Sequence, residues 1–366
     1  MNTNISEQEK FLLQDIGYKP DTARAGTCVI VDAQVKYSNS SDDMVVVMPL
    51  QQALITYDWV QDLMFKLISP DENEHVKQAS ELIDEPIGHF VYIKEGANVN
   101  LPIQTFSILE TPQGRQFTHN IMVIGKNAKV NIISGSTVPN SVHAGHHISI
   151  NETYIYENAE LRSLSVEHWG KNMKIDSYSR TQIGKNATAI DTEIVINPTK
   201  HHFTDSKTYV AMNATNQDES IVFAPSGSHR IMNSEIYLQG EGAHSESISR
   251  MVSAGGSITN NACLIGDASN SKGFLGCDGL KLNDEGEILS TPALLARNYD
   301  AQLSHEASIG MISADKVAYL MASGMSEDSA RSLLIKGFLN LNERDLPDNI
   351  KASVLQMIEM AKSGSM

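Results

Sequence analysis

A turn sequence that recurs at a nearly constant interval is the feature of this chain that most constrains its fold. Each copy joins glycine or asparagine to a following alanine, and the copies are Gly125-Lys126-Asn127-Ala128, Glu157-Asn158-Ala159, Gly184-Lys185-Asn186-Ala187 and Gly240-Glu241-Gly242-Ala243. Successive marker alanines are 31, 28 and 56 residues apart, and the last interval equals two steps of 28. Periods of this length are typical of solenoids, in which each coil stacks on the previous one.

The segments between these turns have the character of β-strands. From Phe90 onward the chain contains short stretches rich in β-branched residues, each followed by Gly, Asn or Ser. Among them are 99–109, 121–124, 130–133, 148–156 and 190–196. We therefore expect a mainly β protein with a right-handed parallel β-helix core over 90–311. An antiparallel sandwich also has many short strands, but it requires hairpin turns at closer spacing.

Residues 1–89 precede the repeat and predict a mixed α/β cap. The first helix should begin after Ser6, because Ser6-Glu7-Gln8-Glu9 has the form of a capping box, and it should end at Gly17. The further elements expected are strands at 28–35 and 44–48, a turn at 38–43, a helix at 50–68, and a last helix that opens at 69–72 and ends before Pro86.

Residues 312–366 return to helical periodicity and predict two capped helices. Ser313 can cap the first helix, which carries Val317, Leu320 and Met321 on one face and stops at Gly324. The second helix is capped at 326–328, and its apolar face consists of Leu333, Leu334, Gly337, Phe338 and Leu341. Such faces need an apolar surface to cover. The sequence leaves open whether the helices close the end of the solenoid or bind a partner.

Composition restricts the class of function. A formal net charge of −16 and a pI near 5.1 argue against nucleic-acid binding, which depends on clustered Lys and Arg. Three cysteines in 366 residues make a poor disulfide framework and suit a reducing compartment. The start of the chain is polar, and the longest apolar run, 44–50, is too short to span a bilayer. We therefore expect a cytoplasmic protein without a membrane anchor.

Several common catalytic signatures are absent from the sequence. There is no Gly-x-x-x-x-Gly-Lys-[Ser/Thr] loop, and 266–272 does not supply one, so we do not expect this chain to bind ATP itself. Gly-x-Ser-x-Gly elbows and Cys-x-x-Cys pairs are also missing. We therefore expect a protein that is not an enzyme and takes any nucleotide energy from a partner.

Two histidine pairs, His146-His147 and His201-His202, are tempting as metal ligands. Neighbouring side chains on a strand point to opposite faces, so neither pair can bind one ion jointly without a bend. We interpret them as surface or turn histidines.

The strongest candidates for metal chemistry lie near the end of the β-rich region. Gly276-Cys277-Asp278 offers a thiol, and Ser304-His305-Glu306-Ala307 offers an imidazole and a carboxylate, which are ligand types suited to iron. From the residues alone, Cys277 could equally be a small buried hydrophobe and the His-Glu dipeptide a solvated edge. On a regular strand only one of His305 and Glu306 can face a shared site.

A series of short motifs relates the chain to a known family. In order they are Gln116-Phe117-Thr118-His119, Gly135-Ser136-Thr137-Val138-Pro139, Val142-His143-Ala144, Glu157-Asn158-Ala159-Glu160-Leu161-Arg162, the block around Cys277, Ser304-His305-Glu306-Ala307, and Gly324-Met325-Ser326-Glu327. In their order and spacing, these motifs resemble those of the SufB/SufD family, and the resemblance covers about three quarters of the chain. That family contains the β-helical scaffold subunits of the SUF iron-sulfur cluster assembly system.

The resemblance implies specific site residues and partners. Cys277 and Glu306 match a cysteine and a glutamate of the cluster-assembling subunit, and His305 matches a histidine of its sister subunit. One chain with all three implies a homodimeric scaffold that carries an iron-sulfur cluster transiently and passes it to apo-proteins. The helical pair implies docking of a SufC-type ABC ATPase, with Leu333, Leu334 and Phe338 as contacts, and a sulfur donor is a further implied partner.

One departure from the family and two rival functions remain open. Ser136 stands where the SufB branch carries a cysteine associated with sulfur delivery, so sulfur would reach Cys277 directly or through Cys263, which could also be a packed core residue. A SufD-like helper would bind the ATPase without carrying iron. A β-helical carbohydrate-active or binding protein is the rival from another class, although the chain has only two tryptophans, Trp59 and Trp169.

Overall fold

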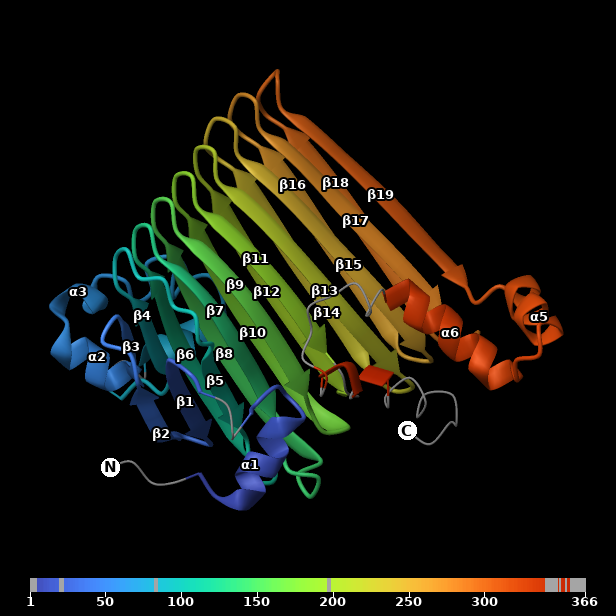
Figure 1. Cartoon of the computed structure of the whole chain (residues 1–366), viewed down its shortest axis with the longest axis horizontal. Helices are drawn as coiled ribbons and strands as arrows, with labels where there is room; N and C mark the ends of the chain where they lie inside the picture. The colour runs from blue at the N-terminus through green and yellow to red at the C-terminus, as the bar shows by residue number, and fades with distance from the viewer. Residues whose placement is uncertain are drawn as a thin grey trace.

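The computed structural model is a parallel β-solenoid whose coils stack along one direction (Figure 1). It describes residues 5–19, 23–81, 85–195, 199–339, 348, 350–352 and 354–355. Strands account for 52% of the chain and helices for 17%, and the solenoid has about 8 turns. The prediction of a mainly β fold with a parallel β-helix core is therefore confirmed.

Each coil contributes one strand to each of two sheets, which we call sheet A and sheet B. Sheet A has the order β19-β17-β15-β13-β11-β9-β7-β5-β1-β2, and sheet B has the order β18-β16-β14-β12-β10-β8-β6-β4-β3. The strands of sheet A are β1 (Gly26–Val31), β2 (Gln34–Ser40), β5 (Ile103–Ile108), β7 (Lys129–Thr137), β9 (Glu160–His168), β11 (Thr188–Val195), β13 (Thr215–Pro225), β15 (His244–Ala254), β17 (Lys272–Lys281) and β19 (Gln302–Met311). Those of sheet B are β3 (Val45–Pro49), β4 (His89–Ile93), β6 (Arg115–Ile124), β8 (Ala144–Ile155), β10 (Asn172–Ile183), β12 (His201–Val210), β14 (His229–Leu238), β16 (Ser257–Gly266) and β18 (Glu287–Ala296).

The recurring turns form the same corner of successive coils. The residue before each buried corner position has a positive φ, between 52° and 67°, at Asn127, Asn158, Asn186, Asn213, Gly242 and Asn270. Asparagine and glycine tolerate this left-handed conformation better than other residues do. The step hidden in the double interval is Asn213-Ala214, whose alanine is fully buried like its counterparts. The predicted period is therefore a real structural repeat.

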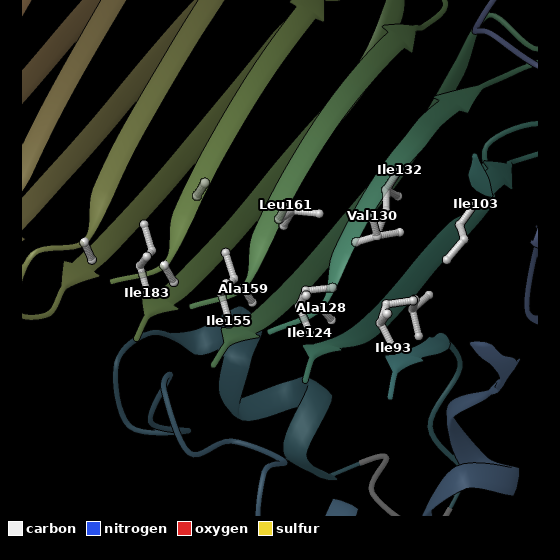
Figure 2. Packing of buried hydrophobic residues seen from close by; sticks show 14 of the residues in the cluster. Ile93, Ile103, Ile124, Ala128, Val130, Ile132, Ile155, Ala159, Leu161 and Ile183 are labelled. Atoms are coloured by element: carbon white, nitrogen blue, oxygen red, sulfur yellow. The ribbon is translucent and has the colours of Figure 1, made fainter. Parts of the chain in front are cut away.

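Aliphatic side chains stack in register inside the solenoid. Figure 2 shows Ile93, Ile124, Ile155 and Ile183 on four successive strands of sheet B, where each is paired with the next. All four are at most 2% exposed. Each strand thus buries the same face as its neighbours, which is why identical residue types recur at equivalent positions along the chain.

The N-terminal segment begins as predicted. Helix α1 (Glu7–Gln14) has a capping box in which Ser6 Oγ accepts from the Glu9 backbone N–H, and Gly17 follows with φ of +102°. The strands differ from the prediction, because β1 turns at Asp32, φ +49°, and β2 continues to Ser40 as the antiparallel neighbour of β1. The predicted turn at 38–43 is therefore wrong over its first half. Residues 38–40 are polar, but they adopt an extended conformation because they pair with β1.

The predicted helix at 50–68 is interrupted. It consists of α2 (Leu50–Thr56) and the short α3 (Asp58–Gln61), after which the chain leaves helical geometry, with φ of +58° at Phe65. The cause is a long-range contact, because the Glu152 carboxylate accepts from the backbone N–H groups of Phe65 and Leu67 at 2.8 and 2.7 Å. Helix α4 (Glu74–Glu81) also begins later than predicted.

Helices cover the outer faces of both sheets. The segment from α2 to α4 packs on sheet B through Leu50, Val60 and Val76, while α1 and α6 (Glu327–Leu339) pack on sheet A. Strands β1 to β3 also join the two sheets, so the N-terminal segment contributes to the solenoid itself. The division at 89/90 and 311/312 remains a prediction.

The C-terminal helices have the predicted starts. Ser313 Oγ accepts from the Lys316 backbone N–H at 3.3 Å ahead of α5 (Ala314–Ala322), and Gly324 follows with φ of +95°. Ile335 and Leu339 of α6 are buried with apolar residues of the outer face of sheet A. This helix therefore lies along a sheet face. Leu341, the last residue of the predicted apolar face, lies outside the described residues.

Among the described residues, the structure contains no helix with both the length and the apolar character needed to cross a membrane.

Candidate functional site

Cys277 lies in β17 and points into the solenoid. Its side chain is only 2% exposed and belongs to a cluster of buried residues made of Val222, Ala224, Met232, Met251, Ile258 and Ile288. Asn260 Nδ2 lies 3.5 Å from Cys277 Sγ, and Ser290 is a second polar neighbour of the thiol. The thiol is thus held in a mainly apolar environment with two polar side chains beside it.

Burial dominates the acid-base behaviour of this thiol. Burial raises the pKa of Cys277 above its usual range, and Asp278 acts in the same direction, while hydrogen bonds with Ser290 and Asn260 oppose the shift. The neutral thiol therefore prevails at pH 7 in the isolated chain. Because the thiolate is the reactive and metal-binding form, Cys277 needs a bound cation or a change in burial to become a ligand.

His305 and Glu306 lie in β19, the last strand of sheet A. The parallel register pairs Leu275 with His305, Gly276 with Glu306 and Cys277 with Ala307. Since side chains alternate along a strand, His305 shares the inner side with Leu275 and Cys277, and Glu306 lies on the opposite side. Both His305 and Glu306 are exposed, because no coil follows β19 in the part of the chain described.

A single chain does not bring these three ligands together. Within the described residues, the group of His, Cys, Asp and Glu side chains close enough to hold one ion consists of His75, His146 and Asp176. Cys277, His305 and Glu306 do not form such a group. Any site that uses all three needs rearrangement or ligands from a second molecule.

The end of the solenoid exposes large apolar side chains beside this region. In β18 and β19, Leu289 is 52% exposed, Leu295 43%, Ile309 45% and Met311 51%. Strand β19 is also the outermost strand of its sheet, as Figure 1 shows. An edge strand with unpaired backbone groups and apolar side chains is a natural surface for association.

The other two cysteines lie away from Cys277. Cys28 is buried in β1 near the opposite end of the solenoid, where burial raises its pKa to about 12. Cys263 lies in β16 between the buried residues Ala262 and Leu264, so it occupies the outer face and is half-buried. The interpretation of Cys263 as a packed core residue is therefore wrong. Its side chain also points away from the interior that holds Cys277.

Ser136 is part of β7. It is paired with Ser107 on one side and Glu167 on the other, on the inner face of sheet A. The Glu167 carboxylate accepts from Trp169 Nε1 at 2.8 Å and lies 3.3 Å from His202 Nε2. Ser136 therefore borders a polar part of the interior.

That polar interior was not predicted from the sequence. Burial raises the pKa of Glu167 to about 7, the Glu193 carboxylate adds to the shift, and the Arg230 guanidinium opposes it. Arg230 is itself buried and contacts His202 Nδ1 at 2.7 Å. Asp191 behaves similarly, because burial raises its pKa to about 7.

The interpretation of both histidine pairs as surface or turn residues is wrong for one member of each pair. His147 and His202 are 3% and 0% exposed and face the interior, because both pairs lie within strands, β8 and β12. Burial lowers the pKa of His147 to about 3, so it is neutral, and its Nδ1 contacts Gln116 Oε1 at 2.7 Å. The alternating members, His146 and His201, lie on the outer face of sheet B.

Fold and site together define a class of protein. The structure is a long parallel solenoid with a buried thiol in the next-to-last strand of sheet A and exposed ligand-type residues on the last strand. The family model described as "SUF system FeS cluster assembly, SufBD core domain" matches residues 107–338. The chain belongs to the SufB/SufD family and has a role in iron-sulfur cluster assembly.

Several proteins align with this chain over nearly its whole length. An "iron-sulfur cluster assembly SufBD family protein" of Archaeoglobus fulgidus is 34% identical over 355 residues, which cover 97% of this chain and 95% of the relative. A protein described in the same words from Methanothermobacter thermautotrophicus strain Delta H is 28% identical, with 98% and 88% covered. The "iron-sulfur cluster assembly protein SufB" of Bacillus subtilis is 23% identical, with 93% and 75% covered.

Proposed function

We propose that this protein is a scaffold on which iron-sulfur clusters are assembled de novo and from which they pass to apo-proteins. The observation that carries the proposal is the position of Cys277. It is an inward-facing thiol one strand away from an open end, where His305 and Glu306 are exposed on the edge strand. Cys277, His305 and Glu306 are the proposed ligands of the cluster, which is the cargo of the protein.

The chemistry of this ligand set suits release as well as binding. Cys277 would bind iron as a thiolate, Glu306 would bind iron through oxygen, and His305 would complete the ligands or transfer protons. Fewer thiolates than the four of a typical resident cluster should hold iron less tightly. A sulfur donor must supply sulfide, and its delivery route does not use a cysteine at position 136.

A homodimer would complete the site. Two copies related by a two-fold axis would bring together the open ends, which carry the ligands and the exposed apolar residues of β18 and β19. Light scattering should find a dimer at micromolar concentration without any partner. Ile309→Asp, which places a charge in this surface, should shift it to monomer, whereas the equally exposed Leu101→Asp near the opposite end should not. A wild-type monomer would refute the shared site.

A SufC-type ABC ATPase is the proposed source of nucleotide energy, and α5 and α6 are the proposed docking surface. Leu333 is 46% and Tyr319 73% exposed on these helices. A shallow pocket of about 300 Å³ between them is lined by Asp315, Lys316, Tyr319, Leu320 and Leu334. Phe338 is less suited to the contact than the sequence predicted, because it packs against the outer face of sheet A.

Anaerobic reconstitution with iron and sulfide tests the scaffold function. The wild-type protein should acquire the absorption and Mössbauer spectra of a cluster and pass the cluster to an apo-acceptor. Cys277→Ser should abolish stable assembly, because a serine hydroxyl is not ionised at neutral pH and binds iron poorly. Glu306→Ala and His305→Ala should weaken assembly to different extents, since the two side chains lie on opposite sides of β19.

Cys263→Ser is the matched control, because Cys263 is a half-buried thiol of the same coil on the outer face. It should retain the parental cluster yield. If Cys277→Ser assembles a cluster at the parental yield and transfers it at the parental rate, the assignment of Cys277 is wrong.

The second candidate is a SufD-like helper that binds the ATPase without carrying iron. It is favoured by the burial of Cys277, whose raised pKa disfavours the thiolate, and by the presence of Ser136. In that case co-purification with the ATPase would persist while the wild-type protein failed to acquire a cluster alone.

A further inference from the structure

A cluster of imidazoles surrounds a buried carboxylate where α4 meets sheet B, far from Cys277. Asp176 in β10 is 4% exposed. His146 Nε2 from β8 lies 2.6 Å from Asp176 Oδ2, and His75 Nδ1 from α4 lies 3.9 Å from the same oxygen. His201 Nε2 from β12 lies 4.0 Å from Asp176 Oδ1. Four side chains from one helix and three strands therefore converge.

We propose that His75, His146 and Asp176, with His201 as a fourth ligand, form a binding site for a divalent transition-metal ion. The ligand atoms of the first three all lie within 4.8 Å of one another. A tetrahedral ion with metal-ligand bonds near 2.0–2.1 Å separates its ligands by roughly 3.4 Å. The distances of 3.9 Å from His75 to Asp176 Oδ2 and 4.0 Å from His201 to Asp176 Oδ1 are close to that value, and the His146 to Asp176 contact must open by less than about 1 Å.

The donor types select the class of ion. Three imidazoles and one carboxylate suit Zn²⁺ and Fe²⁺, whereas Mg²⁺ and Ca²⁺ prefer oxygen ligands alone. The set contains no thiolate, which distinguishes it from a site at Cys277. Between these two ions, Zn²⁺ is expected to bind more tightly, following the general order of stability for divalent metals.

The solenoid itself builds most of the site. The parallel register places His146, Lys174 and His201 side by side on three neighbouring strands. Asp176 follows Lys174 by two residues and so lies on the same outer face. Helix α4 then covers this row and adds His75, whose Nδ1 also contacts Tyr178 Oη at 2.9 Å. A bound ion would link the N-terminal segment to three coils.

Lys174 is the group that an ion must replace. Its Nζ lies 3.2 Å from Asp176 Oδ2, and its side chain is 45% exposed, so it can turn out toward solvent. The Lys174 ammonium and an ion would thus compete for one carboxylate. Lys174→Met removes the competitor and should tighten metal binding several-fold, the direction opposite to that of a ligand mutation.

Metal titration of the full-length protein tests the site, with ZnCl₂ alone and with Fe²⁺ under anaerobic conditions, each against a chromophoric chelator. The wild type should bind one ion at this site, and Co²⁺ should give the d-d absorption of a site with nitrogen and oxygen ligands. His146→Ala should weaken Zn²⁺ binding at least 100-fold and His201→Gln at least tenfold. Zn²⁺ should also raise the melting temperature of the wild type but not of His146→Ala.

His229→Ala is the matched control, because His229 continues the same row on β14 but contacts Ser257 Oγ at 2.8 Å and does not belong to the cluster. It should bind Zn²⁺ like the wild type. Circular dichroism verifies that each variant keeps its β-rich fold. If His146→Ala does not fold, His201→Gln replaces it as the ligand variant, because His201 is half-exposed. Equal Zn²⁺ affinity in the wild type and a folded ligand variant would overturn the proposal, as would a Co²⁺ spectrum with thiolate charge-transfer bands alone.

Discussion

Helix α6 carries two apolar residues with different surroundings, and their replacement separates folding from partner binding. Leu333 is 46% exposed, whereas Phe338 packs against the outer face of sheet A together with Leu280 and Ile312. The Phe338 carbonyl oxygen also accepts from Arg250 Nη1 at 3.3 Å. We expect Phe338→Asp to detach α6 and Leu333→Asp to leave the fold intact.

The expected magnitudes follow from burial. Truncating a fully buried Phe costs about 3–5 kcal/mol, so a half-buried one should cost about 2 kcal/mol. Placing a carboxylate in the same apolar contact adds about 1 kcal/mol or more. The free energy of unfolding should therefore fall by about 3 kcal/mol for Phe338→Asp and change by less than about 0.5 kcal/mol for Leu333→Asp.

Urea denaturation followed by circular dichroism measures stability, and co-purification with a SufC-type ATPase from the same organism measures docking. Leu333→Asp should lose the ATPase while keeping the parental urea midpoint, and Phe338→Leu should keep both. A Leu333→Asp protein that retains the ATPase would show that this exposed face is not the contact. A Phe338→Asp protein as stable as the wild type would refute the packing argument.

Two further predictions concern the solenoid itself. Asn186→Ala should lower the free energy of unfolding by about 1–2 kcal/mol, because alanine disfavours the φ of +57° and because the 3.0 Å hydrogen bond to Asn158 Oδ1 is lost. Asn186→Gly should lower the free energy of unfolding by a smaller amount, since glycine tolerates this φ. Equal urea midpoints for the two variants would contradict this prediction. The second concerns Glu167, whose pKa of about 7 exceeds the usual 4.5, so the folded protein keeps a proton that the unfolded chain has released between these pH values. The free energy of unfolding should therefore fall as pH rises through this window. The fall should be smaller in Glu167→Gln but not abolished, because Asp191 titrates in the same direction. If the slope of the urea midpoint against pH is the same in Glu167→Gln as in the wild type, the effect is excluded.

The repeat was predictable because its cause is local. A corner needs a residue that tolerates positive φ, followed by a small residue that fits inside, and Asn127-Ala128 satisfies both conditions within two positions. The copy at Asn213-Ala214 was missed; its Ala211 stands where three of the four recognised copies have glycine and the fourth has Tyr156. The conformational requirement at the asparagine is stricter than the requirement for glycine before it.

The polar interior was not predictable, because its partners come from distant coils. His202 is stabilised inside the solenoid by Arg230, 28 residues later, and lies near Glu167 from an earlier coil. Glu152 ends helical geometry at Phe65 from 87 residues away. Local periodicity contains no information about such contacts, so it predicted exposed histidines and a continuous helix.

The candidate site was predictable in part. The alternation of His305 and Glu306 across β19 follows from strand geometry alone. The exposure of both residues does not, since it depends on β19 being the last strand of its sheet. The burial of Cys277 likewise depends on the neighbouring strands that supply Met251 and Ile288.

In-register stacking also explains why the two proposed sites have opposite requirements. Within the solenoid each residue has neighbours from the previous and following coils, so the His146, Asp176 and His201 cluster is complete in one chain. No further coil follows β19 within the described residues, and the proposed ligands near Cys277 need rearrangement or a second molecule to come together. Asp176 lies on β10, three strands from β16 in sheet B, and β16 directly precedes the strand of Cys277. At about 4.8 Å per strand, Asp176 and Cys277 are therefore separated by at least about 14 Å along the solenoid. His146→Ala should therefore leave the yield of cluster reconstitution unchanged, and Cys277→Ser should leave Zn²⁺ affinity unchanged. If either variant lost both cluster reconstitution and Zn²⁺ binding, the two sites would not be independent.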